Sequence, residues 1–301
     1  MPELPEVETV RRGLAAILPG RRVASVAVEH PRVTRRGAGP GTGQALRTGV
    51  RGRTITAVHR RGKFLWLDLA GRPLVVHLGM SGQVLLTGSA APEVLVHSRA
   101  HRRLRLRLAP DDAGELWFVD QRTFGWALLD DYADVHAVSP VPRIAAHIAA
   151  DPLDTAFDIN GVLARIRGRR AGIKSVLLDQ TVVSGIGNIY ADEALWRARL
   201  HYATPAHRLP AARVRTLLGH VTDIFQAALG KGGTSFDALY RDVNGRSGRF
   251  AVDLDAYGRG GQPCRRCGRS LVREPFANRS SVRCPRCQRR PRGMADPVVG
   301  A

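Results

Sequence analysis

The first pattern along the chain is a run of apolar residues with helical spacing. Apolar side chains recur every three or four positions, at Leu4, Val7, Val10, Leu14 and Leu18. Residues at this spacing share one face of an α-helix. Pro5 suits the first turn, where the backbone N–H has no acceptor, and Pro19-Gly20 interrupts the pattern. The pattern predicts an amphipathic N-terminal helix.

Short β-rich runs between glycine-containing turns follow this helix. In the stretch 103–108, Arg and Leu alternate strictly, which predicts a strand with one apolar and one cationic face. Further runs of this kind lie at 23–28, 54–58, 64–69, 73–77, 84–86, 115–119 and 126–129. Together they predict an antiparallel sandwich or flattened barrel behind the N-terminal helix, in a domain spanning residues 1–136.

Beyond residue 136 the pattern changes. The stretch 137–158 carries Pro140, Pro142 and Pro152, and we expect a hinge there. Apolar residues then return to helical spacing at 162–166, 173–180, 189–200 and 210–229. The polar, glycine-containing stretch 234–250 predicts a flexible functional loop. We therefore expect an α+β protein whose second domain, at 159–250, is helical.

The charge balance changes the picture from fold to function. The 301 residues include 46 Lys and Arg against 26 Asp and Glu, so the net charge is +20. Such an excess of cations destabilises a compact state unless a polyanion is the partner, and nucleic acid is therefore the first expectation. The alternative is a GC-rich genome, which raises the Arg content of all its proteins.

The sequence offers no feature of a membrane or secreted protein. No apolar run approaches the roughly 18 residues of a transmembrane helix, and the N-terminus lacks the cationic and apolar regions of a secretory signal. We expect a cytoplasmic protein.

The four cysteines form two CxxC pairs separated by sixteen residues, Cys264, Cys267, Cys284 and Cys287. Two such pairs supply four thiolates in the tetrahedral arrangement that Zn²⁺ prefers, and four protein ligands leave no position for a catalytic water. We expect one structural Zn²⁺ in a β-hairpin zinc ribbon at 251–290, followed by a tail at 291–301. Redox-active pairs are the alternative. Arginines that could contact a phosphate backbone surround the pairs, at Arg265, Arg266, Arg273, Arg279, Arg283 and Arg286.

Further motifs, taken with these cysteines, resemble one known family. They are the N-terminal MPELPEVETV, HLGMSG at 77–82, DQRTFG at 120–125 and VVSGIGNIYA at 182–191. The chain resembles the bacterial formamidopyrimidine-DNA glycosylases of the Fpg/Nei family, with matching features from Pro2 to Cys287. Its start is the ELPEV form and not the EGPE form of the endonuclease VIII branch.

The resemblance implies a bifunctional DNA glycosylase and AP lyase of base-excision repair. Such an enzyme is a hydrolase and a lyase, and it excises oxidised purines such as 8-oxoguanine and formamidopyrimidines before β,δ-elimination at the abasic site. The implied partner is double-stranded DNA that contains these lesions or abasic sites. The protein is expected to be a monomer in the cytoplasm, associated with the nucleoid through DNA.

The resemblance also implies the catalytic residues. Loss of Met1 exposes Pro2, whose secondary amine is the Schiff-base nucleophile. Glu3 is the proton donor and Glu6 assists or orients the amine. Proton donors in the elimination are Lys63 and Arg279, and Arg279 also contacts phosphate. From the residues alone, complementarity to the helix dipole remains the alternative for the glutamates, and we expect Glu8 to be a helix-surface or capping residue.

The DNA contacts implied by the resemblance lie in the other motifs. Met80, Arg122 and Phe124 fill the gap that a flipped nucleotide leaves, and Arg122 hydrogen-bonds the orphaned cytosine. Core packing is the alternative for Met80. The remaining implied contacts are Lys174 and Asn188. The stretch 234–250 matches the lesion-capping loop. The chain departs from the family pattern at Thr123, where many relatives carry Arg, and in the hinge at 149–153.

Two other functions remain to be distinguished. An endonuclease VIII-like glycosylase would prefer oxidised pyrimidines, but the ELPEV start and the Met80, Arg122 and Phe124 set argue against it. A non-catalytic DNA-binding zinc protein is the rival from a different class. Such a protein would be expected to lose Pro2, Glu3 or Lys63, and this sequence retains all three.

Overall fold

We describe the protein from a computed structural model, which covers residues 2–37, 42–110, 114–134, 136–137, 139–233, 243–244 and 250–291. The chain divides into two compact units. The first comprises Met1–Ile148 and Ala227–Val252, and the second comprises Ala149–Gln226 and Asp253–Ala301. Most of the predicted lesion-capping loop at 234–250, and the tail from residue 292, lie outside the described residues.

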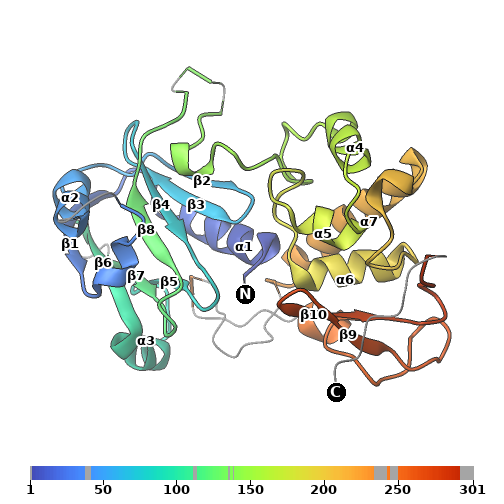
Figure 1. The fold of residues 1–301 in the computed structure, drawn as a ribbon. Coiled ribbons are helices and arrows are strands. Elements are labelled where there is room, and N and C mark those ends of the chain that lie inside the picture. Colours follow the sequence, from blue (N-terminus) through green and yellow to red (C-terminus); the bar gives the residue numbers. More distant parts are fainter. Residues whose placement is uncertain are drawn as a thin grey trace. The chain divides into compact units, whose positions relative to one another are not determined.

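The first unit contains helix α1 (Leu4–Ala15) and two four-stranded antiparallel sheets (Figure 1). One sheet has the strand order β1-β6-β7-β5, and the other has the order β2-β3-β4-β8. The strands are β1 (Arg22–Val28), β2 (Ala57–Arg61), β3 (Phe64–Asp68), β4 (Pro73–His77), β5 (Gln83–Leu86), β6 (Arg102–Ala109), β7 (Glu115–Val119) and β8 (Trp126–Leu129). This arrangement confirms the predicted N-terminal helix and antiparallel sandwich.

The core of this unit joins the helix to both sheets. Val7, Val10 and Leu14 of α1 belong to the same buried cluster as the inward-facing residues of the two sheets. In β6 the leucines of the alternating stretch 102–109 are buried, whereas the arginines between them are half-buried or exposed. The cationic face predicted for this strand therefore exists, and on it Arg105 pairs with Glu115 at 3.1 Å.

Two short helices of the first unit were not predicted from the sequence. Helix α2 (Thr42–Val50) contains Gly43 and Gly49 and buries only Leu46 and Val50. Helix α3 (Pro92–Ser98) buries none of its residues. Both lack the apolar face that makes a helix recognisable in a sequence. Single 3₁₀ turns occur at η1 (Pro31–Thr34), η2 (Arg99–His101) and η4 (Arg143–Ala145).

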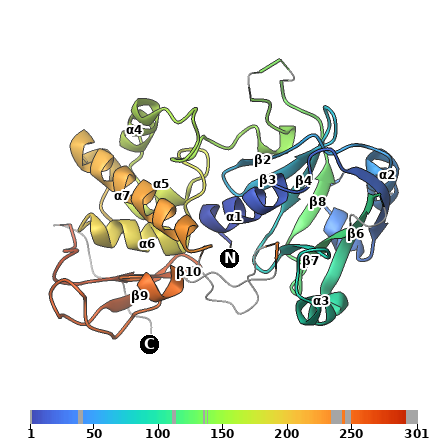
Figure 2. The ribbon, with the colours of Figure 1, turned by 180° about the vertical axis from the view of Figure 1, so that it is seen from behind.

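The second unit is mainly helical and ends in a hairpin. Its helices are α4 (Ile159–Arg167), α5 (Ile173–Leu178), α6 (Asn188–Arg197) and most of α7 (Ala211–Gly230). A 3₁₀ turn, η5 (Ala206–Arg208), precedes α7, and another, η6 (Phe250–Asp253), lies where the chain passes from the first unit to the second. Strands β9 (Val272–Phe276) and β10 (Arg279–Arg283) pair antiparallel, as Figure 2 shows from behind. These elements confirm the predicted helical region and zinc-ribbon hairpin. Among the helices described, none has the length and apolar character needed to span a bilayer.

Candidate active site and nucleic-acid interface

The start of α1 brings together the predicted N-terminal catalytic residues. Pro2 is buried and directly precedes Glu3, the N-cap residue. The backbone N–H of Glu3 donates to the Glu6 carboxylate at 2.8 Å, in a capping box that ties the two residues to the first turn. Both glutamates are buried, and Gly233 is packed so closely that a Cβ on it would lie 3.1 Å from the Glu6 Oε1. The amine position and two carboxylates thus share one enclosed site.

Glu8 does not lie on the helix surface, and the expectation from the sequence was wrong. Its carboxylate is buried and accepts hydrogen bonds from Arg11, Arg12 and Arg60 at 2.8 to 3.0 Å. Burial by itself raises the pKa of Glu8, but the hydrogen bonds and positive charges of Arg11 and Arg60 outweigh this effect and lower it to about 2. Glu8 therefore connects α1 to β2 as a stabilising ion pair.

Replacing Glu8 with Gln should destabilise the protein at neutral pH. Arg60 is almost fully buried and would lose its carboxylate partner, and breaking such a pair costs on the order of 3 kcal/mol. Because the pKa of Glu8 is lowered in the folded state, its contribution is complete above about pH 4.5 and disappears as the pH falls toward 2. Urea unfolding of both proteins at pH 7, 4 and 3 measures the difference. Arg12→Gln, at an exposed partner, should cost less than about 1 kcal/mol. An equal loss in E8Q at pH 7 and pH 3 would contradict the ion-pair account.

Lys63 lies in the turn between β2 and β3, where Gly62 adopts a φ of +54°. The pairing of Phe64 with His77 of β4 places the start of β3 beside His77. Burial, and then the charges of Lys63, Arg36 and Arg35, lower the pKa of His77 to about 4. His77 is therefore a neutral imidazole beside Lys63, and its Nδ1 accepts the Gly79 N–H at 3.1 Å. The sequence reasoning assigned His77 no role, although it begins the HLGMSG motif.

Two neighbouring loops present the predicted wedge. The loop at 78–82 joins β4 to β5, and the loop at 120–125 joins β7 to β8. The loops are in contact, because a Cβ on Gly79 would lie 2.6 Å from the backbone of Phe124 and Gly125. Met80 and Phe124 are 42% and 47% exposed, so neither side chain belongs to the core. The alternative that Met80 packs in the core is therefore wrong, and the two contacting loops carry Met80, Arg122 and Phe124, each of which is exposed.

In the second unit, the turn between α5 and α6 carries a further group of predicted residues. The Gln180 side chain bonds the Leu178 and Ile186 carbonyls and the Gly185 N–H, and so fixes the turn. Asn188 is the first residue of α6, and its Nδ2 donates to the Ser280 carbonyl at 3.0 Å. Arg279, which precedes that carbonyl, is exposed. Asn188 therefore lies at a helix N-terminus, where backbone N–H groups favour anions, and it contacts the residue next to Arg279.

Lys174 requires a correction, because it has no exposed surface. Its ammonium donates to Asp192 of α6 at 2.7 Å and lies 4.7 Å from the centroid of the Phe276 ring. Burial raises the pKa of Asp192 more than the positive charge of Lys174 lowers it. Asp192 also accepts from Ser281 and Val282 of β10. Lys174 is therefore a buried residue that contacts α6 and the β9–β10 hairpin, and its side chain is not exposed to contact DNA as predicted.

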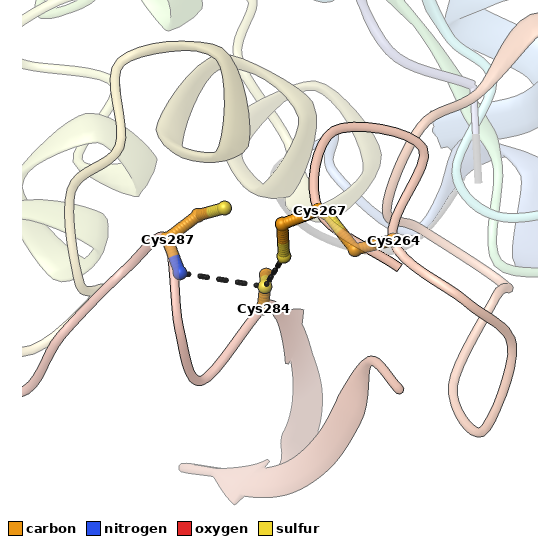
Figure 3. Close-up of side chains that lie close together, drawn as sticks. All are labelled: Cys264, Cys267, Cys284 and Cys287. Atoms are coloured by element: carbon orange, nitrogen blue, oxygen red, sulfur yellow. Dashed lines mark hydrogen bonds between the residues drawn. The ribbon is translucent and has the colours of Figure 1, made fainter. Parts of the chain in front are cut away.

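The four cysteines lie where a metal ion could join them (Figure 3). Their Sγ atoms all lie within 4.8 Å of one another, which is close to the spacing that tetrahedral zinc with Zn–S bonds of about 2.3 Å requires. Trp196 of α6 donates its indole N–H to the Cys264 Sγ at 3.4 Å. The donor set fits Zn²⁺. The Arg283 side chain is buried and forms an ion pair with Glu274 at 2.6 Å. The predicted contact of Arg283 with phosphate is therefore not supported.

Comparisons with known proteins agree with this geometry. Family models match residues 1–127 as "Formamidopyrimidine-DNA glycosylase N-terminal domain", 148–238 as "Formamidopyrimidine-DNA glycosylase H2TH domain" and 261–290 as "Zinc finger found in FPG and IleRS". The chain is 55% identical to the formamidopyrimidine-DNA glycosylase of Acidothermus cellulolyticus, over 97% of this chain and 99% of that protein.

Two solved structures extend the likeness to three dimensions. The MutM (Fpg) protein from Thermus thermophilus is 35% identical, with a TM-score of 0.79 over 95% of this chain and 98% of that chain. The Lactococcus lactis Fpg in complex with DNA that contains an abasic site is 30% identical, with a TM-score of 0.78 over 96% of this chain and 100% of that chain.

Proposed function

Because the chain belongs to the formamidopyrimidine-DNA glycosylase family, we propose that it excises oxidised purines from DNA with Pro2 as the nucleophile and then cleaves the abasic site. Its activity is that of a DNA glycosylase and AP lyase of base-excision repair. The observation that carries the assignment of the nucleophile is the enclosed site at the start of α1, where Pro2 lies beside the paired Glu3 and Glu6.

The first step is attack by the Pro2 amine on the C1′ carbon of the damaged nucleotide. A bond forms between the amine nitrogen and C1′, the bond from C1′ to the base breaks, and the amine gives up its N–H proton. The bond from C1′ to the ring oxygen O4′ then breaks, which opens the sugar and leaves the iminium, and Glu3 supplies the proton that the departing base or the ring oxygen requires. An α-amino group has a pKa of roughly 7.7–8.0, so a useful fraction is unprotonated near pH 7. Glu6 accepts the Glu3 backbone N–H at 2.8 Å, and it thereby fixes the position of Glu3 beside the amine.

The second stage is elimination from the resulting iminium. A secondary amine gives an iminium with no N–H to lose, so the positive charge remains and acidifies the hydrogen on C2′. Removal of that proton breaks the bond from C3′ to its phosphate, and a further elimination breaks the bond to the other phosphate. Lys63 and Arg279 are proposed to bind these phosphates and to donate protons in this stage.

The DNA is proposed to contact the exposed wedge of the first unit and the phosphate site of the second. Met80 and Phe124 would replace the stacking that the flipped nucleotide leaves behind, and Arg122 would hydrogen-bond the base opposite the lesion. Asn188 and Arg279 would bind the backbone. The four cysteines hold one structural zinc, which fixes the β9–β10 hairpin and has no role in the chemistry. Because its proposed substrate is chromosomal DNA, we expect the enzyme to act in the cytoplasm, at the nucleoid.

The substrate class follows the relatives. The Lactococcus lactis Fpg structures contain DNA with an abasic site or with Fapy-dG, and we propose the same class of duplex for this chain. Residues 1–127 match the N-terminal domain of formamidopyrimidine-DNA glycosylases, and this match does not favour the endonuclease VIII-like alternative. A non-catalytic DNA-binding protein is not favoured because Pro2, Glu3 and Glu6 are retained in an enclosed site.

Borohydride trapping tests this function. The mature protein should form a covalent adduct with a duplex that contains 8-oxoguanine opposite cytosine, because borohydride reduces the iminium to a stable amine. Excision from this duplex should be at least about tenfold faster than from a duplex containing thymine glycol. The absence of any adduct would exclude the proposed glycosylase and lyase activity. Faster excision from the thymine glycol duplex would assign the chain to the endonuclease VIII-like alternative. A duplex without a lesion is the control.

A further inference from the structure

The loop at 120–125 presents Arg122, which is proposed to hydrogen-bond the base opposite the lesion, and Phe124 of the wedge, and it is fixed from inside by Asp120. This residue is fully buried at the end of β7. One carboxylate oxygen accepts the Ser81 hydroxyl at 2.5 Å and the Arg122 N–H at 3.2 Å, and the other accepts the Gly125 N–H at 2.6 Å. Asp120 therefore closes its own loop and joins it to the loop that carries Met80.

Arg35 fixes the same loop from outside. It follows the 3₁₀ turn η1, and its guanidinium donates to three consecutive carbonyls, those of Thr123 at 3.0 Å, Phe124, and Gly125 at 2.8 Å. It also bonds the Arg32 carbonyl at 3.0 Å, which anchors it to its own segment. A planar guanidinium with several N–H groups can bond all of these oxygens at once, whereas the ammonium of lysine is a single compact donor.

The loop has a conformation that needs such support. Thr123 adopts a φ of +54°, in the left-handed region that a β-branched residue rarely occupies. A residue in this conformation costs on the order of 1–3 kcal/mol and persists only where its surroundings hold it. Arg35 bonds the carbonyl of Thr123 itself and those of the next two residues. Without these bonds, we expect the backbone between Arg122 and Gly125 to adopt a conformation with less strain at Thr123.

We propose that Arg35 is a positioning residue that sets the preference of this enzyme for the base opposite the lesion. The proposal rests on the proposed function, in which Arg122 hydrogen-bonds that base. A hydrogen bond weakens steeply once its distance and angle depart from the preferred geometry, so a displaced Arg122 would distinguish less well between opposite bases. Arg35 itself contacts no reacting atom, so its effect should appear in the choice between opposite bases and not in the chemical step.

Arg35→Lys tests this role, and Arg36→Lys is its matched control. Both changes keep the positive charge, and both positions are exposed, so neither should unfold the protein. The Arg36 guanidinium lies 5.9 Å from the centroid of the Trp126 ring, and no bond from it to the loop at 120–125 is seen among the described residues. The preference for 8-oxoguanine opposite cytosine over 8-oxoguanine opposite adenine should fall about tenfold in R35K, through KM more than kcat. R36K should keep the preference of the wild type.

Amide hydrogen exchange of the free protein tests the same proposal without catalysis. Segment 120–126 should exchange at least about tenfold faster in R35K than in R36K. Unchanged exchange in R35K would overturn the proposal whatever the activity shows, and so would an equal loss of activity opposite both bases or an unchanged preference. If the wild type excised no base at all, the proposed function would fail, and the exchange comparison would still decide whether Arg35 positions the loop.

Discussion

A protein that retains Met1 should form no adduct with an 8-oxoguanine duplex under borohydride, and its excision rate should fall by more than about 1,000-fold. In that protein the Pro2 nitrogen is part of a peptide bond, so it has no basic lone pair and cannot form an iminium. Cell-free synthesis with methionine aminopeptidase inhibited would supply the protein, and intact mass would verify it. Excision and trapping are then compared with the mature protein at pH 7.

Two controls separate the loss of the amine from a blocked site. Affinity for a duplex with an uncleavable abasic analogue should stay within about threefold of the mature protein, since the wedge and phosphate contacts are unchanged. Pro2→Gly keeps a free primary amine and should trap more slowly than the wild type, but measurably, because a primary amine gives an imine that can lose its proton. Equal trapping by the Met1-retaining protein and the mature protein would show that Pro2 is not the nucleophile.

Removal of zinc should produce the second large effect, a loss of DNA affinity of about 100-fold. The hairpin β9–β10 has a small apolar core, formed around Trp196, Leu271, Val282 and the cysteines themselves, and such small metal domains unfold without their ion. Arg279 lies on this hairpin, next to the Ser280 carbonyl that Asn188 binds, so its position relative to α6 would be lost. Cys287→Ala, measured by zinc content and by binding to an abasic-analogue duplex, gives the result.

Arg279→Gln separates the phosphate contact from the fold of the ribbon. This variant should retain one zinc per chain and lose only about tenfold in affinity. Re-addition of zinc to chelated wild-type protein should restore full affinity. If Cys287→Ala bound DNA as tightly as the wild type, the ribbon would have no part in the interface.

Much of the fold could be predicted because its signals are local. The apolar spacing of α1 and the alternation of Arg and Leu in β6 each report one buried face, and both elements form as predicted. The CxxC pairs predicted a metal site because each knuckle supplies two thiolates from one turn. Helices α2 and α3 bury few residues or none, so the sequence contained no apolar pattern that could reveal them.

The candidate site was predictable as a set of residues, and the structure decided which of them support it and which are exposed. Glu8 was expected on the surface because the spacing of apolar residues in its helix leaves it outside the apolar face. It is instead buried against Arg60, which lies 52 positions along the chain and cannot be identified from the helix alone. Lys174 was expected to contact DNA, and its burial depends on Asp192 of α6 and Phe276 of the hairpin.

The sequence by itself predicted the zinc ligands, because each CxxC pair has its own local geometry. It also predicted the N-terminal proline with its glutamates and the wedge residues, through short motifs that resemble those of one family. Only the tertiary structure decided the pairing of charges and the conformation of the loops. Arg35 contacts a loop almost ninety positions away, and no periodicity or motif reports such a contact. Burial and ion pairing depend on which distant segments meet, and this is settled when the sheets and helices pack.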